Sequence, residues 1–153
     1  MPIPFRFRPA TQADWPAVSQ LLASSQLPLD GAYEHLDTFE LAFKNDVLVG
    51  VAGLEIYGKA ALLRSIAVLE TERGHGLGQQ LTERAIKQAQ ALGLHQLVLL
   101  TETAKAFFPR FSFQPIARAD APQSVQASVE FQGACPDSAT VMQLHLAPLS
   151  LPA

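Results

Sequence analysis

The sequence RGHGLG at residues 73–78 places three glycines in six positions, directly before a stretch with helical periodicity. The first turn of a helix leaves backbone N–H groups without partners. Together with the helix dipole, these N–H groups form a binding site for anions, and glycine lets a phosphate oxygen approach the backbone closely. The stretch therefore indicates a cradle for a diphosphate. The alternative is a tight connection between a strand and a helix that binds no ligand.

The spacing of residues excludes other phosphate- and metal-binding motifs. No Lys-Ser/Thr pair follows the glycines, so the stretch is not a P-loop. The glycines also miss the G-x-G-x-x-G spacing of a Rossmann site, and the strand before them belongs to a predicted antiparallel hairpin. His35, His95 and His145 lack the spacing of metal ligands, so we expect no metal.

Length and charge limit the class of protein. The 153 residues suggest one domain, residues 1–153. A net charge of −3 without basic runs argues against nucleic acid as a partner. The N-terminus lacks the apolar region of a signal peptide, and no apolar run is long enough to span a membrane. The single cysteine, Cys135, cannot form an internal disulfide. We therefore expect a cytoplasmic protein with no membrane partner.

Hydrophobic periodicity predicts the elements before the glycines. Ile3, Phe5 and Phe7 alternate with proline and arginine, as in a strand with one buried face. Thr11 and Asp14 have the spacing of a capping box at the start of a helix, with aspartate in place of glutamate. The front of the chain therefore reads as a strand followed by a helix.

Turn and cap residues divide the remaining elements. Asn45-Asp46 and Gly58-Lys59 are typical of hairpin turns, Gly93 of a helix C-cap, and Asp30 of an N-cap. The predicted elements are a strand near 2–10, a helix near 11–26, a loop with a short helix at 27–38, three strands within 39–70, a helix at 76–92, a strand at 96–101, a helix beginning near Thr101, a strand at 112–118, a loop with helical turns at 119–138 and a strand at 140–146. This order predicts a mixed α/β domain.

The residues around the glycines match a more specific motif. A strand ending Ile-Ala-Val at 66–68 precedes Arg73, Gly76 and Gly78, and this arrangement resembles the R-x-x-G-x-G acetyl-CoA site of the GCN5-related N-acetyltransferases (GNAT). The predicted order of strands and helices also agrees with that of the family over nearly the whole chain. The resemblance implies the GNAT fold, with about six to seven mostly antiparallel strands and about four helices. It also implies acetyl-CoA as cosubstrate and direct acetyl transfer to an amine.

The resemblance assigns the cofactor contacts. The pyrophosphate of CoA would lie on the N–H groups of Gly74 to Gln79, and the pantetheine arm would pair with the backbone at 66–68, where a bulge usually splays the strand. A backbone N–H near Val68 would stabilise the oxyanion. His75 is expected to be exposed or to contact phosphate rather than to act as a catalyst. The expected contacts are Ile66, Ala67, Val68, Arg73, Gly74, His75, Gly76, Leu77, Gly78, Gln79 and Phe108.

The sequence departs from the family pattern at two catalytic positions. Leu62 stands where the family often has a carboxylate, and Phe108 where it often has a proton-donating tyrosine. Glu55 is the nearest substitute for the carboxylate. Strand alternation places Leu62, Arg64, Ile66 and Val68 on one face, with Glu55 diagonally beside Arg64. Glu55 and Arg64 are then either a structural ion pair, or a base acting through water and a clamp for an anionic substrate group.

Several stretches narrow the family. LPLDG, GLEIYGKAALLRSIAV, LLTETAKAFFPRFSF and EFQGACPDSATVM resemble the arsenic-resistance N-acetyltransferases, and more distantly the acetyltransferase domain of N-acetylglutamate synthase. The resemblance implies an acceptor contact at Ser138, with Pro136 where the synthase has an arginine. Leu29 and Arg64 are the other expected acceptor contacts. The implied substrate is a small amino-acid-like amine, such as an arsenical or phosphinic analogue of glutamate, and the implied assembly is a monomer or homodimer. A peptide N-acetyltransferase and an inert CoA-binding module are the alternatives.

Overall fold

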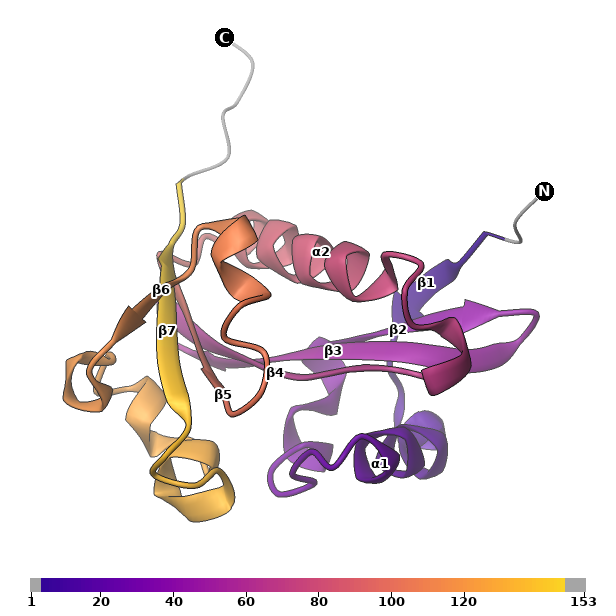
Figure 1. Ribbon diagram of the computed structural model, residues 1–153, viewed down its shortest axis with the longest axis horizontal. Helices are drawn as coiled ribbons and strands as arrows, with labels where there is room; N and C mark the ends of the chain where they lie inside the picture. The colour runs from indigo at the N-terminus through magenta and orange to yellow at the C-terminus, as the bar shows by residue number, and fades with distance from the viewer. Residues whose placement is uncertain (1–3, 148–153) are drawn as a thin grey trace, which may run out of the picture. The chain divides into compact units, whose positions relative to one another are not determined.

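The computed structural model describes residues 4–147, in which seven strands form a mixed sheet with the order β1-β2-β3-β4-β5-β7-β6 (Figure 1). The pairs β1–β2, β2–β3, β5–β7 and β6–β7 are antiparallel, and β4–β5 is parallel. The strands are β1 (Arg6–Pro9), β2 (Phe39–Lys44), β3 (Val47–Tyr57), β4 (Ala60–Val68), β5 (Gln96–Thr101), β6 (Gln114–Ile116) and β7 (Thr140–His145). The predicted fold class is confirmed.

Two α-helices, α1 (Trp15–Ser24) and α2 (Leu77–Ala91), accompany the strands in the described part of the chain. The shorter 3-10 turns are η1 (Gln12–Asp14), η2 (Tyr33–Thr38), η3 (Glu70–Glu72), η4 (Phe108–Phe111), η5 (Arg118–Asp120) and η6 (Val125–Ala127), and η7 (Glu130–Ala134) is a π-turn with a kink at Gly133. None of the helices within residues 4–147 combines the length and the hydrophobicity needed to cross a lipid bilayer.

The described residues form two compact units, one of residues 4–54 and 64–85 and the other of residues 55–63 and 86–147. In the first unit α1 and the start of α2 cover opposite faces of the strands (Figure 1). The strand residues alternate accordingly, because successive side chains point to opposite faces. Leu41 and Val51 pack in the cluster on the α1 side, and Ala42 and Ala52 pack with Leu77 and Leu81 of α2.

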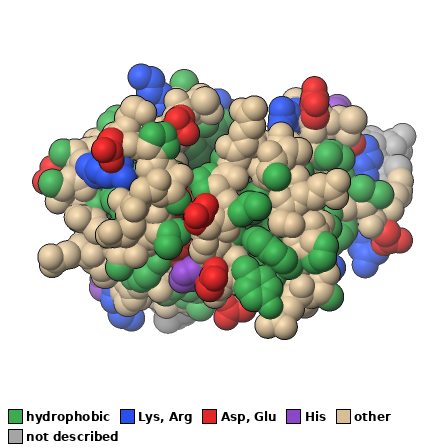
Figure 2. All heavy atoms as spheres, turned by 90° about the horizontal axis from the view of Figure 1, so that it is seen from below, with side chains coloured by type: hydrophobic (Ala, Val, Ile, Leu, Met, Phe, Trp, Pro, Cys, Tyr) green, Lys and Arg blue, Asp and Glu red, His purple; other side chains and the backbone are tan. Residues whose placement is uncertain are grey.

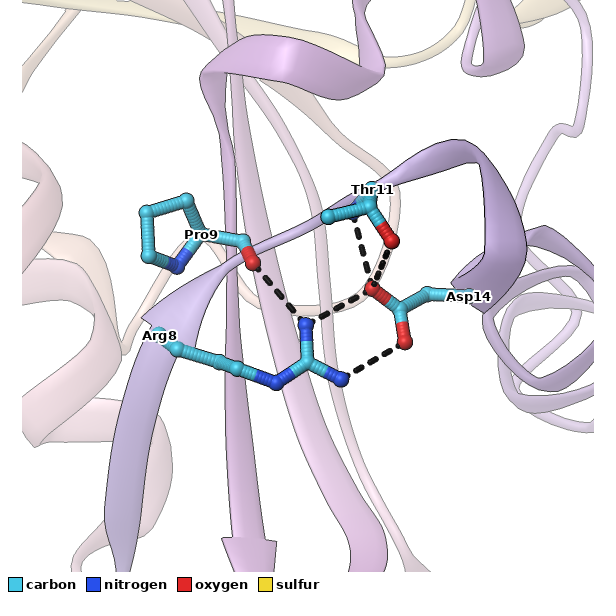
Figure 3. Close-up of polar contacts among 4 residues, drawn as sticks. All are labelled: Arg8, Pro9, Thr11 and Asp14. Carbon is cyan, nitrogen blue, oxygen red and sulfur yellow. Dashed lines mark hydrogen bonds and ion pairs between the residues drawn. The ribbon is translucent and has the colours of Figure 1, made fainter.

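The start of α1 is fixed by a cluster of polar contacts (Figure 3). Asp14 accepts hydrogen bonds from the Thr11 backbone N–H at 2.8 Å and the Thr11 hydroxyl at 3.0 Å. Two guanidinium nitrogens of Arg8 also donate to this carboxylate, at 2.8 and 2.7 Å. This charge-assisted pair lowers the pKa of Asp14 far below its usual range. The predicted Thr11–Asp14 contact is therefore present, although it begins the short turn η1, which leads into α1.

The hairpin turns confirm the sequence prediction. Asn45 and Asp46 both have positive φ, at 51° and 64°, as a two-residue type I′ turn requires. Gly58 has φ 64° in the turn between β3 and β4. At the end of α2, Gly93 has φ 76°, and the N–H of Leu94 donates to the carbonyl of Ala89, which is a Schellman cap.

The second unit has its own core on β4, β5 and β7. The parallel ladder of β4 and β5 pairs Ala60–Leu62 with Gln96–Val98, and β7 pairs with β5 and β6. The helical turns after β6 cover this core through Ala121 and Val125, which pack with Leu62, Val98 and Val141.

Three local predictions are wrong or fall outside the described residues. No α-helix begins at Thr101, because β5 includes Thr101 and the turn η4 is the helical element between β5 and β6. Pro109 lies in this segment and lacks the N–H that a continuing helix requires. Asp30 caps nothing, since Ala32 is the N-cap of η2 and η2 has no side-chain cap. Ile3 lies outside the described residues, whereas Phe5 and Phe7 pack in the α2-side cluster as predicted.

Charged side chains of both signs are scattered over the face shown in Figure 2. Hydrophobic side chains gather in patches on the same face.

Candidate functional site

The glycine loop, residues 73–78, follows β4 and the turn η3 and leads directly into α2. Gly74 has φ 85° and Gly76 has φ 79°, a conformation that other residues rarely adopt. A Cβ built on either glycine would meet no atom within 4 Å. The loop thus needs glycine for its backbone conformation, and the space beside both residues is open to a ligand.

Backbone donors gather at the start of α2. The N–H of Gln80 donates to the carbonyl of Gly76 at 3.0 Å, which closes the first helical turn. The N–H groups just before it have no acceptor within the helix. Leu77 is 1% exposed and packs with Leu81 against β3, where a Cβ on Gly50 would lie 3.0 Å from Leu77. Packing therefore holds the end that carries the free donors in place.

The charged residues of the glycine loop are exposed. Arg73 donates through Nε to the carbonyl of Val68 at 3.1 Å, which links the loop to the end of β4. His75 is exposed. A diphosphate on the N–H groups of this helix terminus would lie near the Arg73 guanidinium and the His75 ring, in the favourable field of the helix dipole. The residues present therefore fit the pyrophosphate of CoA.

Strand β4 contains an irregularity that changes which side chains share a face. Ser65 has φ 61°, a left-handed conformation for a non-glycine residue inside a strand. After it, Ala67 packs in the α1-side cluster, whereas Ile66 and Val68 pack in the α2-side cluster. Arg64 reaches the loop that follows α1. The prediction that Arg64 shares a face with Ile66 and Val68 is therefore wrong, because the bulge at Ser65 breaks the two-residue period.

Arg64 is 3% exposed, and its guanidinium makes several hydrogen bonds. Nη1 donates to the carbonyl of Asp30 at 2.7 Å and Nη2 to the carbonyl of Pro28 at 3.0 Å. Nε donates to the hydroxyl of Ser65 at 2.9 Å. Several donors that a bound carboxylate could use are thus directed to the protein itself. The clamp role of Arg64 remains a prediction.

Glu55 is 1% exposed near the end of β3, and the hydroxyl of Tyr57 donates to its Oε1. The two residues are two apart on one strand and so share a face. Tyr57 is the last residue of β3. Its contact with Glu55 was not predicted, although the two-residue spacing could have indicated it.

The other predicted site residues lie in loops and turns. Leu29 is 39% exposed in the loop after α1, and Ser138 is exposed just before β7. Phe108 is 6% exposed in η4 and makes edge-to-face contacts with Phe107 and Phe113. Their roles toward cofactor and acceptor remain predictions. Among residues 4–147, no three His, Cys, Asp or Glu side chains cluster in a way that could hold a metal ion.

Comparison with known proteins agrees with this geometry. A family model described as the acetyltransferase (GNAT) family matches residues 7–113. An uncharacterized N-acetyltransferase of Chlorobaculum tepidum is 30% identical over 98 residues, which are 63% of this chain and 63% of that relative. The match thus spans less than two thirds of the relative's length.

Two solved structures share the fold at low identity. N-acetylglutamate synthase from Neisseria gonorrhoeae, complexed with coenzyme A and N-acetylglutamate, has a TM-score of 0.80 at 18% identity. That match covers 96% of this chain and 36% of the synthase. A Mycobacterium tuberculosis protein in complex with CoA has a TM-score of 0.76 at 23% identity, covering 93% of this chain and 99% of the other. Both proteins bind CoA on the same fold.

Proposed function

The chain belongs to the acetyltransferase (GNAT) family, and we propose that it transfers an acetyl group from acetyl-CoA to the amine of a small amino-acid-like acceptor. The family expected from R-x-x-G-x-G is therefore confirmed, and with it the use of acetyl-CoA. We propose further that residues 1–153 act as one N-acetyltransferase domain. The acceptor, the catalytic roles and the cytoplasmic location are part of the proposal.

One observation carries the cofactor half of this proposal, namely the open, left-handed glycines in front of the N-terminus of α2. Gly74 and Gly76 combine positive φ with free space where a side chain would be. Gly58 has the same positive φ and free space in a hairpin turn, but the free space of the glycine loop lies in front of the N–H groups at a helix terminus. The N–H groups from Gly74 to Gln79 would hold the diphosphate, and Arg73 would add a charge-assisted contact.

The end of β4 would hold the rest of the cofactor. The backbone of Ile66, Ala67 and Val68 would pair with the pantetheine arm as a neighbouring strand does. Bound acetyl-CoA supplies the activated acetyl group. An N–H near Val68 would donate to the carbonyl oxygen as negative charge develops on it.

Proton removal from the amine would be the task of Glu55. The amine must be neutral to attack, and a carboxylate that accepts its proton through a water molecule can serve as general base. Burial and the hydrogen bond from Tyr57 hold this carboxylate in one orientation. The amine forms its bond to the acetyl carbon as the thioester bond breaks, and the CoA thiolate takes a proton from water, since Phe108 cannot donate one. Because transfer is direct, no covalent intermediate on the protein is needed, and Cys135 has no assigned role.

The acceptor class rests on resemblance and on three residues. Ser138 is suited to a substrate that carries an acid group, Leu29 offers an apolar contact, and Arg64 fixes the loop that contains Leu29. The neighbouring synthase structure contains N-acetylglutamate, which is the acetylated form of such an amino acid. The resemblance to the arsenic-resistance branch narrows the proposed acceptor to glutamate analogues with an arsenical or phosphinic side chain, while Pro136 argues against glutamate itself.

Consumption of acetyl-CoA tests the proposal directly. The panel contains glutamate, a phosphinic and an arsenical glutamate analogue, the decarboxylated amine of each, and a peptide with a free N-terminus. We expect turnover with the analogues and weaker turnover with the decarboxylated amines. Turnover on the peptide alone would refute the small-molecule acceptor, and no turnover on any amine would indicate a module that only binds CoA.

A further inference from the structure

Arg64 on β4 binds two carbonyl groups of the loop that follows α1, which we call the 25–32 loop. Nη1 donates to Asp30 at 2.7 Å and Nη2 donates to Pro28 at 3.0 Å. A buried guanidinium is costly unless its N–H groups are hydrogen bonded, and a loop carbonyl needs a partner as well. The two requirements are met together, so the position of the loop and the position of Arg64 depend on each other.

The two anchored carbonyls lie on either side of Leu29. The carbonyl of Leu29 itself accepts the N–H of Ala32 at 3.1 Å, and Gly31 has φ 77°, as the third residue of a type II turn requires. The backbone of Leu29 is therefore held at three consecutive carbonyls. Its side chain is nevertheless 39% exposed, so this rigid backbone presents an apolar group to the solvent.

The direction of Arg64 depends on the bulge next to it. With regular alternation Arg64 would share a face with Ile66, which packs on the α2 side. The left-handed conformation of Ser65 allows Arg64 to reach the loop after α1 instead. The Ser65 hydroxyl also accepts the hydrogen bond from Nε at 2.9 Å. A backbone strained in this way persists only where surrounding contacts hold it, and such strain clusters at functional sites.

We propose that Arg64 is a positioning residue, which holds the 25–32 loop so that Leu29 forms one wall of the acceptor pocket and thereby sets acceptor specificity. This inference rests on the proposed function. It assigns Arg64 an effect on the acceptor through the loop, in place of direct contact with a substrate carboxylate. Acceptors with and without a carboxylate should therefore depend on Arg64 to the same degree.

The test uses two single variants, their double variant and a control. Arg64→Lys keeps the charge but cannot donate to Pro28 and Asp30 with the same fork. Leu29→Ala removes the presented side chain at an exposed position, so it should fold even if Arg64→Lys does not. The control is Arg84→Lys, which breaks the bidentate pair of Arg84 with Glu40 elsewhere in the same unit.

Two measurements report on these variants. In Arg64→Lys, amides of residues 29–32 should exchange hydrogen roughly tenfold faster or more, since charge-assisted hydrogen bonds are lost. The KM for the acceptor should rise roughly 10- to 100-fold, equally for an amino-acid acceptor and its decarboxylated amine, with CoA affinity unchanged. Leu29→Ala should also raise the acceptor KM. In the double variant the acceptor KM should rise by less than the product of the two single-variant increases, because both residues act on the same loop. Arg84→Lys should change neither the hydrogen exchange of residues 29–32 nor the acceptor KM.

Three results would overturn the positioning role. The first is unchanged exchange at residues 29–32 in Arg64→Lys. The second is a rise in KM confined to acceptors that carry a carboxylate, which would mean that Arg64 reads the carboxylate directly. The third is a Leu29→Ala enzyme with unchanged acceptor KM. A wild-type protein that acetylates none of the small amines refutes the proposed function instead, and the exchange data then decide alone whether Arg64 holds the loop.

Discussion

The glycine loop and the middle of β4 both contain left-handed residues, but they use different residue types. In the loop, Gly74 and Gly76 adopt positive φ at little steric cost. In β4, Ser65 adopts φ 61° although it carries a side chain and is 7% exposed. The loop therefore owes its shape to its own residues, whereas the strand owes its bulge to the contacts around it.

The same difference separates the proposed tasks of the two regions. The loop presents backbone donors to open space, which suits binding of a cofactor common to the whole family. The strand segment is buried and holds Arg64 against the 25–32 loop, which suits discrimination between acceptors. If this division is correct, changes in the loop should alter CoA affinity, and changes on the strands should alter turnover, acceptor choice or stability.

The largest expected effect separates turnover from cofactor binding. Glu55→Gln keeps the shape of the side chain but removes the proposed base on β3. Turnover should fall by roughly 10²–10⁴-fold, the usual contribution of general base catalysis, and CoA affinity should change little. Steady-state kinetics and calorimetry provide the two readings.

The control for Glu55 is Glu130→Gln, which alters another glutamate buried in the same unit at 4% exposure. It should leave turnover unchanged. A Glu55→Gln enzyme with full activity at neutral pH would give Glu55 a structural role.

The next effect concerns the glycine loop. Gly76→Val places a β-branched residue at φ 79° and fills the space proposed for the pyrophosphate. CoA affinity measured by calorimetry should fall by roughly 100-fold or more, since at least two charge-assisted hydrogen bonds would be lost.

Gly58→Val is the matched control, because Gly58 has φ 64° and equally open space but lies in a hairpin turn. It should lose stability and retain CoA affinity. If folded Gly76→Val bound CoA as tightly as the wild type, the cofactor would lie elsewhere.

A smaller effect tests the strand. Ser65→Val introduces a β-branched side chain at positive φ and removes the acceptor for Arg64 Nε. The free energy of unfolding in urea should fall by roughly 1–3 kcal/mol. Ser65→Gly should lose less, because glycine tolerates this φ while giving up only the hydroxyl. Equal stability of Ser65→Val and wild type would show that the bulge is not held against strain.

The smallest expected effect is pH dependence at the start of α1. Because the pKa of Asp14 is lowered by the Arg8 guanidinium, the folded state favours the charged carboxylate. Its contribution to the free energy of unfolding is present above the unfolded pKa of about 3.9 and is lost as the pH falls below it. Since Arg8 is about half exposed, this contribution should be roughly 1 kcal/mol or less.

Urea unfolding of wild type and Asp14→Asn at several pH values measures this contribution. The two curves should differ by a constant amount well above the unfolded pKa of about 3.9. They should approach each other gradually as the pH falls below it, because the pKa of the folded carboxyl lies far lower. Parallel curves across the whole pH range would show that the Arg8–Asp14 pair contributes nothing to the free energy of unfolding.

Features that depend on neighbouring residues in the chain were predictable from the sequence. The turn at Asn45-Asp46, the cap at Gly93 and the start of α2 behind its glycines all depend on residues within a few positions of one another. The Thr11–Asp14 contact belongs to the same group. Its partner Arg8 was not predicted, although it lies only 6 residues from Asp14, because no pattern in the sequence specifies that the chain turns back there.

Contacts between distant segments were not predictable. Arg64 lies 34 residues from Asp30 and 36 from Pro28 in sequence, and strand periodicity placed its side chain on the wrong face. The predicted helix after β5 failed in a related way. Its sequence permits a helix, but β5 extends through Thr101 in its pairing with β7. The turn η4 then begins at Phe108, with Pro109 in its first turn, and ends at the left-handed Ser112.

The sequence by itself determined the family, the mixed α/β class and the glycine-rich start of α2, because these depend on a short motif, hydrophobic periodicity and residue spacing along the chain. Only the tertiary structure decided that Ser65 would be left-handed, that Arg64 would face the loop after α1, and that Tyr57 would hold Glu55. The physical reason is the reach of the interactions. A glycine determines its own φ, whereas a strained serine and a buried guanidinium keep their conformations only while partners from remote segments hold them.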